Sequence, residues 1–218
     1  MTDRPILFSA PMVRALLADR KTQTRRILSG LGDQPIVEYD GMFMWREGYR
    51  WGAVTNPKFP PGVRCKVGDR LYVREAWKAP ERLDTTAPRD IPKGTSVYFV
   101  ADDRLWPVAR YRQAMHMPRW ASRLMLTVTD VRVERLQAIS DDDAIAEGIE
   151  YNPRLDPVGQ CKWRHYGRES AGIYPPSASY MTLWDSINGH GSSDADPWVV
   201  AYTFTVQRGN IDQIARAA

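Results

Sequence analysis

The stretch RLMLTVTDVRVERL, residues 123–136, decides the fold class that we expect for this chain. From Leu124 to Val128 every second residue is a leucine or a valine, which is the period of a β-strand with one buried face. The series resumes at Val131 after a shift of phase at Thr129–Asp130, and such a shift predicts a β-bulge. The stretch is therefore predicted to form one long, bulged strand.

Further strands are expected on both sides of this stretch. Residues rich in β-branched and aromatic side chains alternate with polar ones between turn signals, which is typical of strands. The basic stretch that follows the first helix also alternates, with Thr22, Thr24 and Arg26 on one face. The other strand patterns are KVGDRLYVREAW (66–77), SVYFVA (96–101) and WVVAYTFTV (198–206).

About three short helices accompany these strands. Each is marked by a capping residue, a terminating glycine or an apolar face at helical spacing. The predicted class is α+β, with a β-barrel-like sheet and short flanking helices. The helices are expected from Ser9 to Asp19–Arg20, from Ser140 to Gly148, and over SYMTLWDSI (179–187).

We expect residues 1–218 to form a single domain, because no low-complexity linker divides the chain. Irregular segments near 30–62, 78–94 and 151–176 are expected as loop insertions. Within the first of them, EYDGMFMW (38–45) predicts a hairpin.

The composition argues against several classes of protein. Cys65 and Cys161 belong to no paired motif, and His116, His165 and His190 are scattered, so no metal site is expected. No glycine-rich phosphate loop is present, so we expect no nucleotide cofactor. Nothing resembles a signal peptide or a membrane span, and the cytoplasm, with no membrane partner, is the expected location.

The net charge of +4 favours polyanionic partners, and the distribution of charge is more informative than the total. Between Arg104 and Arg123 there are five arginines and no acidic residue, interleaved with aromatic rings. Such a stretch suits phosphate attraction and base stacking, with Arg119, Trp120 and Arg123 as a candidate rim. The alternatives are a solvated basic face and, for Trp120, packing in the core.

A second basic stretch, DRKTQTRR (19–26), places Lys21 three residues before Thr24. A threonine becomes a nucleophile only when a base takes its proton, and a lysine can be that base if its pKa is lowered. A carboxylate is then needed to position the amine, and Glu75, Glu147 and Asp19 are the candidates. The alternative is a basic strand edge whose threonines simply suit β geometry.

Several segments together resemble the ASCH-domain family of the PUA-like superfamily, in particular its larger, phage-type members. The most specific is ILFSAPMVRALLADRKTQTRRI (6–27), a helix followed by the K-T-x-T-R-R segment. The others agree in order: VGDRLYVREAW (67–77), MPRWASRLMLTVTDVRVERLQAISDDDAIAEGI (117–149), LWDSING (183–189) and PWVVAYTF (197–204).

This resemblance implies a small PUA-like barrel with a cleft that binds RNA or modified bases, in a bacterial or phage-infected cell. One branch of the family hydrolyses N4-acetylcytidine with a lysine, a threonine and a glutamate, which match Lys21, Thr24 and Glu147 here. The resemblance therefore implies an amidohydrolase in which Lys21 activates Thr24. Backbone N–H groups or Arg26 are the candidate donors to the oxyanion.

On the second strand, Arg74 and Glu75 are expected to line the cleft, with Trp77 as a stacking wall or as a plug of the barrel. The alternative to catalysis is a module that binds RNA, single-stranded DNA or a modified base. Ribonuclease activity is a lesser option, since the acidic run Asp141–Asp143 is better explained as the first turn of a helix.

Overall fold

The computed structural model describes residues 2–28, 36–39, 42–47, 50–53, 62–103, 109–152, 162–168 and 172–214. The α-helices are α1 (Ala10–Leu17), α2 (Asp141–Ala146) and α3 (Pro176–Asn188). Short 3-10 helices are η1 (Glu81–Leu83), η2 (Pro88–Asp90), η3 (Val100–Asp102), η4 (Ala114–His116), η5 (Arg119–Ala121) and η6 (Leu136–Ala138). The strands are β1 (Asp3–Leu7), β2 (Gln23–Ile27), β3 (Ile36–Tyr39), β4 (Met42–Glu47), β5 (Arg50–Ala53), β6 (Arg70–Arg74), β7 (Trp77–Lys78), β8 (Tyr98–Phe99), β9 (Leu124–Arg135), β10 (Trp163–Arg164), β11 (Gly172–Ile173) and β12 (Trp198–Arg208).

A mixed five-stranded sheet in the order β1-β6-β9-β12-β2 is the centre of the fold. The β1–β6 pair is parallel, and the β6–β9, β9–β12 and β12–β2 pairs are antiparallel. The class is therefore α+β, as predicted. Over the described residues β1 and β2 remain the two edges, so the sheet is open where a barrel-like sheet was expected.

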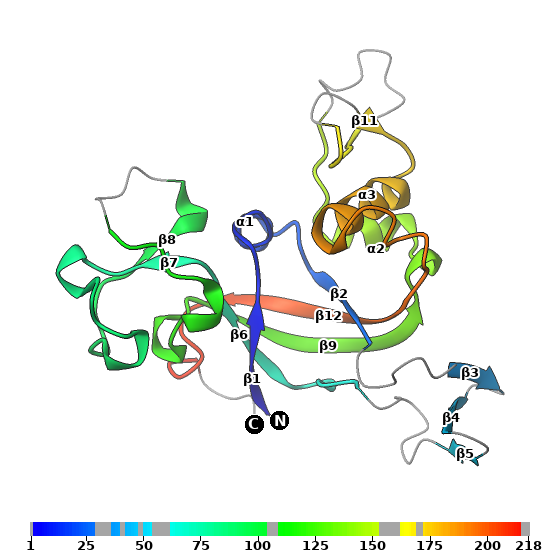
Figure 1. The fold of residues 1–218 in the computed structure, drawn as a ribbon, viewed down its shortest axis with the longest axis horizontal. Helices are drawn as coiled ribbons and strands as arrows, with labels where there is room; N and C mark the ends of the chain where they lie inside the picture. Colours follow the sequence, from blue (N-terminus) through cyan, green and yellow to red (C-terminus); the bar gives the residue numbers. More distant parts are fainter. Residues whose placement is uncertain are drawn as a thin grey trace.

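Most elements outside the sheet lie at its two ends and above its middle (Figure 1). Helices α2 and α3 pack together at one end, and the β7–β8 ribbon lies at the other. Helix α1 lies between them, and the small β3–β4–β5 sheet stands apart from the main one. The site described below forms on the side of α2 and α3.

Strand β9 carries the predicted bulge. Asp130 pairs with Thr203 of β12, whereas Val128 pairs with the next residue, Phe204. Thr129 is therefore the extra residue, at the position where the apolar series changes phase. The leucines and valines before and after the bulge both face the core, which explains why a single strand can carry two phases of one pattern.

The main core lies between the sheet and α1. Val13 and Leu16 of α1 pack with Leu126 of β9 and with Phe204 of β12, and all four side chains are buried. This arrangement fixes α1, and with it the turn that leads into β2. Two smaller apolar clusters lie beside α2–α3 and beneath the β7–β8 ribbon.

The helix boundaries agree with most of the predicted signals. The hydroxyl of Ser140 accepts a hydrogen bond from the backbone N–H of Asp143 at 3.2 Å, which caps α2. Gly148 and Gly189 follow α2 and α3 with positive φ angles, which glycine adopts without strain. Helix α3 begins at Pro176, three residues earlier than the sequence pattern predicts, because a proline suits the first turn of a helix.

The predicted insertions contain some regular structure. The hairpin around EYDGMFMW is confirmed by the pairing of β3 with β4, and β5 adds a third strand that was not predicted. The segment 78–94 contains η1 and η2, and the segment 151–176 contains the β10–β11 pair. The rest of 30–61 and most of 151–162 lie outside the described residues.

Candidate functional site

The turn before β2 lies along the carboxyl end of α2. The backbone N–H of Thr22 donates to the carbonyl of Ala146 at 2.9 Å, and the Lys21 amine donates to the carbonyl of Glu147 at 2.8 Å. The Arg20 guanidinium donates to the next carbonyl along the chain at 3.3 Å. The three carbonyls at and just after the end of α2 thus each accept a hydrogen bond, two of them from cations, which favour a helix carboxyl end.

Gly148 makes this close approach possible. A Cβ at this position would lie 3.0 Å from the Cβ of Lys21 and 3.1 Å from the Cβ of Ala15. The φ angle of Gly148 is +86°, which a side chain rarely adopts. The glycine that ends α2 therefore also makes room for Lys21.

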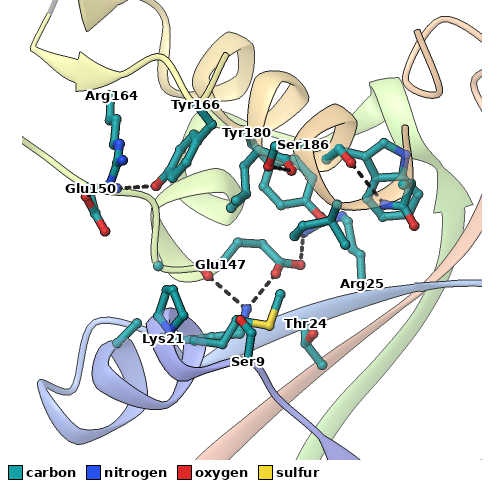
Figure 2. Close-up of a pocket in the computed structure, with 18 of the residues that line it drawn as sticks. Ser9, Lys21, Thr24, Arg25, Glu147, Glu150, Arg164, Tyr166, Tyr180 and Ser186 are labelled. Atoms are coloured by element: carbon teal, nitrogen blue, oxygen red, sulfur yellow. Dashed lines mark hydrogen bonds and ion pairs between the residues drawn. The ribbon is translucent and has the colours of Figure 1, made fainter. Parts of the chain in front are cut away.

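A cavity of about 290 Å³ opens at this junction. Lys21, Thr24 and Glu147 all line it, although Lys21 and Glu147 are 126 residues apart in the chain. Its walls come from the start of α1, from β2, from the end of α2, from α3 and from the β10 segment (Figure 2). The side chains contributed by α3 and the β10 segment include Arg164, Tyr166, Tyr180, Leu183, Trp184 and Ile187.

The Lys21 amine is buried and paired with a carboxylate. Only 2% of Lys21 is exposed, and its Nζ lies 2.8 Å from Glu147 Oε2. Its Nζ is also 5.7 Å from the centre of the Phe8 ring. Burial penalises the charged ammonium and lowers the pKa of Lys21, and the Glu147 carboxylate offsets this only in part. The direction of this shift is the one that a general base requires.

Arg25 lies on the side of the Glu147 carboxylate opposite to Lys21 (Figure 2). Its Nη1 donates to Glu147 Oε1 at 3.2 Å, and its Nη2 donates to Glu134 Oε1 at 2.6 Å and to Asp143 Oδ2 at 3.0 Å. Arg132 also donates to Asp143, at 2.8 Å. Three carboxylates thus surround one buried guanidinium, in a network that joins β2, β9 and α2.

Thr24 and Arg26 lie on the other face of β2. Thr24 is buried at the cavity wall, and among the contacts of the described residues no hydrogen bond joins its hydroxyl to Lys21. The Arg26 guanidinium donates to the carbonyl of Leu7 at 2.7 Å and lies 5.4 Å from the centre of the Phe8 ring. The alternation read from the sequence therefore separates Arg25 from Arg26, as expected for a strand.

Of the three carboxylates considered as partners of Lys21, Glu147 is the one in contact. Asp19 is exposed, on the turn that follows α1, with a φ angle of +54°. Glu75 pairs with Arg123 at 2.8 Å. Both are absent from the cavity lining.

The expectation that Arg74, Glu75 and Trp77 line this cleft is not met, because the end of β6 turns toward the β7–β8 ribbon. Arg74 donates to the carbonyl of Met117 at 2.7 Å. Glu75 is buried beside Arg123, and burial raises the pKa of its carboxyl. Trp77 is fully buried in the apolar cluster beneath the ribbon, so it packs in a core, but it does not plug a barrel because the main sheet is open.

The basic rim predicted from Arg119, Trp120 and Arg123 also lies away from the cavity. Trp120 packs against the cluster beneath the ribbon, in agreement with the core alternative. The other described arginines of the stretch, Arg110 and Arg112, donate to the chain at Asp84 or Leu83, while Arg104 and Trp106 lie outside the described residues. Each rim arginine binds two carboxylates: Arg119 those of Asp3 and Asp212, and Arg123 those of Glu75 and Asp102.

Sequence reasoning named Arg25 only as a cation near Lys21, and it missed both the contact of Arg25 with Glu147 and the aromatic side chains of the cavity. The apolar spacing of Tyr180, Trp184 and Ile187 on α3 predicts a buried helix face, but only the fold shows that part of this face lines a cavity. Tyr166 and Arg164 come from a segment that carries no periodic signal.

Comparisons with protein-family models, with curated proteins and with solved structures found no match to this chain. Within the described part of the chain, no group of three or more histidine, cysteine, aspartate or glutamate residues is arranged to hold a metal ion. None of the described helices is long and apolar enough to cross a membrane.

Proposed function

We propose that this cavity hydrolyses the amide bond of an N4-acylated cytidine or a related modified pyrimidine nucleoside. We also propose that the chain is an ASCH protein. The observation that carries the proposal is the meeting of Lys21, Thr24 and Glu147 in one cavity. These are the three residues that the resemblance assigns to catalysis, and Lys21 and Glu147 are in direct contact at 2.8 Å.

In the proposed reaction Lys21, in its neutral form, takes the proton of the Thr24 hydroxyl. The Thr24 oxygen attacks the carbonyl carbon of the acyl group, and the electron pair of the carbonyl moves to its oxygen. When the tetrahedral intermediate collapses, the C–N bond breaks and the exocyclic amine leaves with the proton from Lys21. Water then hydrolyses the ester on Thr24 and releases the carboxylic acid.

The contacts of Glu147 support an orienting role in this scheme. One carboxylate oxygen accepts from Lys21 and the other accepts from Arg25. A carboxylate engaged in this way orients the amine more readily than it delivers a proton to a leaving group. The hydroxyl of Thr24 would meet the amine only after substrate binding, which is a common feature of sites without a ligand.

The walls of the cavity suit a pyrimidine. Tyr166, Tyr180 and Trp184 offer aromatic surface for a planar base, and Arg26 offers a donor to a developing oxyanion.

A PUA-like relationship is part of the proposal. The bond from Arg26 to the Leu7 carbonyl supports it, because this contact links the two edge strands of the open sheet.

Turnover of N4-acetylcytidine tests the proposal. The wild type is expected to release cytidine and acetate, whereas Thr24→Ala is expected to lose roughly 10³-fold or more in rate, as when other catalytic units lose their nucleophile. Thr24→Ser keeps a hydroxyl and serves as the matched control. No turnover by the wild type, or equal turnover by the wild type and Thr24→Ala, would rule the proposal out.

A second candidate function is binding of a modified base without chemistry, and the mixed lining of the cavity favours it. Arg26 and Arg164 lie among aromatic side chains, which suits a base with its attached phosphate. In that case affinity for an oligonucleotide should fall as salt rises, with a slope that counts phosphate contacts. Affinity that does not depend on salt, or no detectable affinity, would argue against this alternative.

A further inference from the structure

We propose that Arg25 is a positioning residue of this site: it takes one oxygen of the Glu147 carboxylate and leaves the other to the Lys21 amine. Only the catalytic consequence of this inference rests on the proposed function. The arrangement of the three side chains can be tested without any substrate.

The geometry of Glu147 is the first argument. Its Oε1 accepts from Arg25 Nη1 at 3.2 Å and its Oε2 accepts from Lys21 Nζ at 2.8 Å. A carboxylate held through both oxygens cannot rotate about its terminal bond, which is otherwise a soft torsion. Arg25 thus determines where Oε2 faces, and Oε2 determines where the amine lies.

The second argument is that Arg25 is itself held rigidly. Its side chain is fully buried, and its Nε and Nη2 donate to Glu134 at 3.0 Å and 2.6 Å. Its Nη2 also donates to Asp143, and the ring of Tyr180 lies 5.8 Å from its guanidinium carbon. A guanidinium offers its N–H donors in a fixed planar fork, whereas a lysine amine is a flexible point charge that fixes no direction.

The third argument concerns charge. The Glu147 carboxylate favours the charged form of Lys21, and Arg25 and Arg26 disfavour it. Removing Arg25 takes away a positive neighbour and leaves the Glu147 carboxylate to Lys21 alone, so both changes should raise the pKa of Lys21. The groups that face this network are Asp143 from α2, Glu147 just after α2, Glu134 and Arg132 from β9, Arg26 from β2 and Tyr180 from α3.

The titration of Lys21 tests the inference directly. The chain has six lysines, so the side-chain ¹³Cε signals can be followed by NMR, and Lys21→Met identifies the one that belongs to Lys21. Arg25→Gln is expected to move the midpoint of Lys21 toward higher pH. Arg132→Gln is the matched control. Like Arg25→Gln, it removes a cation that binds Asp143, but the Arg132 side chain does not contact Glu147. It should leave the midpoint in place.

An unchanged midpoint in folded Arg25→Gln, or an equal shift in both variants, would overturn the inference. If Arg25→Gln does not fold, Arg25→Lys keeps the charge and loses the fork. Without the fork, the Glu147 carboxylate should hold the Lys21 amine less firmly. Reductive methylation of this amine should therefore be several-fold faster in Arg25→Lys than in the wild type, and an unchanged rate would overturn the inference.

The catalytic consequence has its own measurement. If the chain hydrolyses N4-acetylcytidine, Arg25→Gln should lower kcat by about 10²-fold, as small misplacements in active sites do, with little change in KM. The acid limb of its pH–rate profile should move with the NMR midpoint. A chain without hydrolytic activity would contradict the proposed function and would leave the titration result to decide the role of Arg25.

Discussion

At the scale of single residues, the burial of Lys21 leads to a prediction about pH. Its pKa lies below 10.5, because burial disfavours the ammonium. If the neutral amine is the base, the rate of hydrolysis should rise with pH through this lowered pKa and then reach a plateau. A pH–rate profile for N4-acetylcytidine measures this directly. A rate that falls as the pH rises across the same range would contradict the assignment of Lys21 as the base.

Asp143 supplies a prediction about stability. Hydrogen bonds from Arg132 and Gln23 outweigh the effect of burial and hold the pKa of Asp143 below 3.8. Because this pKa is depressed in the folded state, the contribution is present above the unfolded-state value and is lost as the pH falls through the folded value. Asp143→Asn should therefore lower the free energy of unfolding at neutral pH by about 1–3 kcal/mol.

Urea unfolding at several pH values measures this difference. The gap between the wild type and Asp143→Asn should narrow as the pH falls from the unfolded-state value of about 3.9 toward the lower folded-state value, at which the folded carboxyl takes up its proton. Asp142→Asn is the control, since Asp142 is exposed on the same turn of α2. A gap that stays constant down to low pH would contradict the ionic account of Asp143.

At the scale of elements, the junction of α2 with the turn before β2 depends on Gly148. Gly148→Ala combines strain at a φ angle of +86° with contacts of 3.0–3.1 Å to Lys21 and Ala15. We expect a loss of about 2–4 kcal/mol in the free energy of unfolding, since backbone strain and overpacking each cost about 1–3 kcal/mol. Thermal and chemical unfolding measure the loss.

Gly68→Ala is a matched control for this change. Gly68 has the same φ angle of +86°, but a Cβ there meets nothing within 4 Å. The difference between the two variants therefore isolates the close approach of Lys21 to α2. Equal losses of stability in the two variants would contradict that role for Gly148.

The elements themselves were largely predictable from local patterns. The two-residue period predicted β2, β9 and β12, and the shift of phase at Thr129–Asp130 predicted the bulge. The order of strands in the sheet was not predictable in this way, because pairing between β6, β9 and β12 joins segments far apart in the chain. The sequence also did not show the direction of the chain after β6. For this reason the side chains from Arg74 to Trp77 were expected to line a cavity that they do not reach.

The residues of the site show the same limit. Lys21 and Thr24 stand in one short segment, so sequence could propose them together. In its local sequence Arg25 is one of several cations on a basic strand. Nothing nearby in the sequence shows that three carboxylates surround it, those of Glu134, Asp143 and Glu147. Buried ion networks of this kind become visible only when the elements are assembled.

At the scale of the whole molecule, the segment that follows β12 ties the sheet to the segment before β9. The Asn210 amide donates to the carbonyls of Arg119, Trp120 and Ser122 at 2.9–3.0 Å. Asn210→Ala leaves these part-buried carbonyls without this donor and should cost about 1–3 kcal/mol in the free energy of unfolding. Urea unfolding followed by two probes measures the loss.

The comparison variant for this prediction is Asn188→Ala, which removes a single amide contact with Trp184 at the end of α3. Asn210→Ala should be clearly the less stable of the two. Equal stability in the two variants would contradict a tethering role for the segment after β12.

The most direct test of the central claim, that Lys21 activates Thr24 as a nucleophile, is mass spectrometry of the chain quenched with acid during turnover of N4-acetylcytidine. We predict one acetyl group on the peptide that contains Thr24, and none on that peptide in Thr24→Ala. Cytidine release by Thr24→Ala at the wild-type rate, or an acetyl group on Lys21 in place of Thr24, would contradict the account.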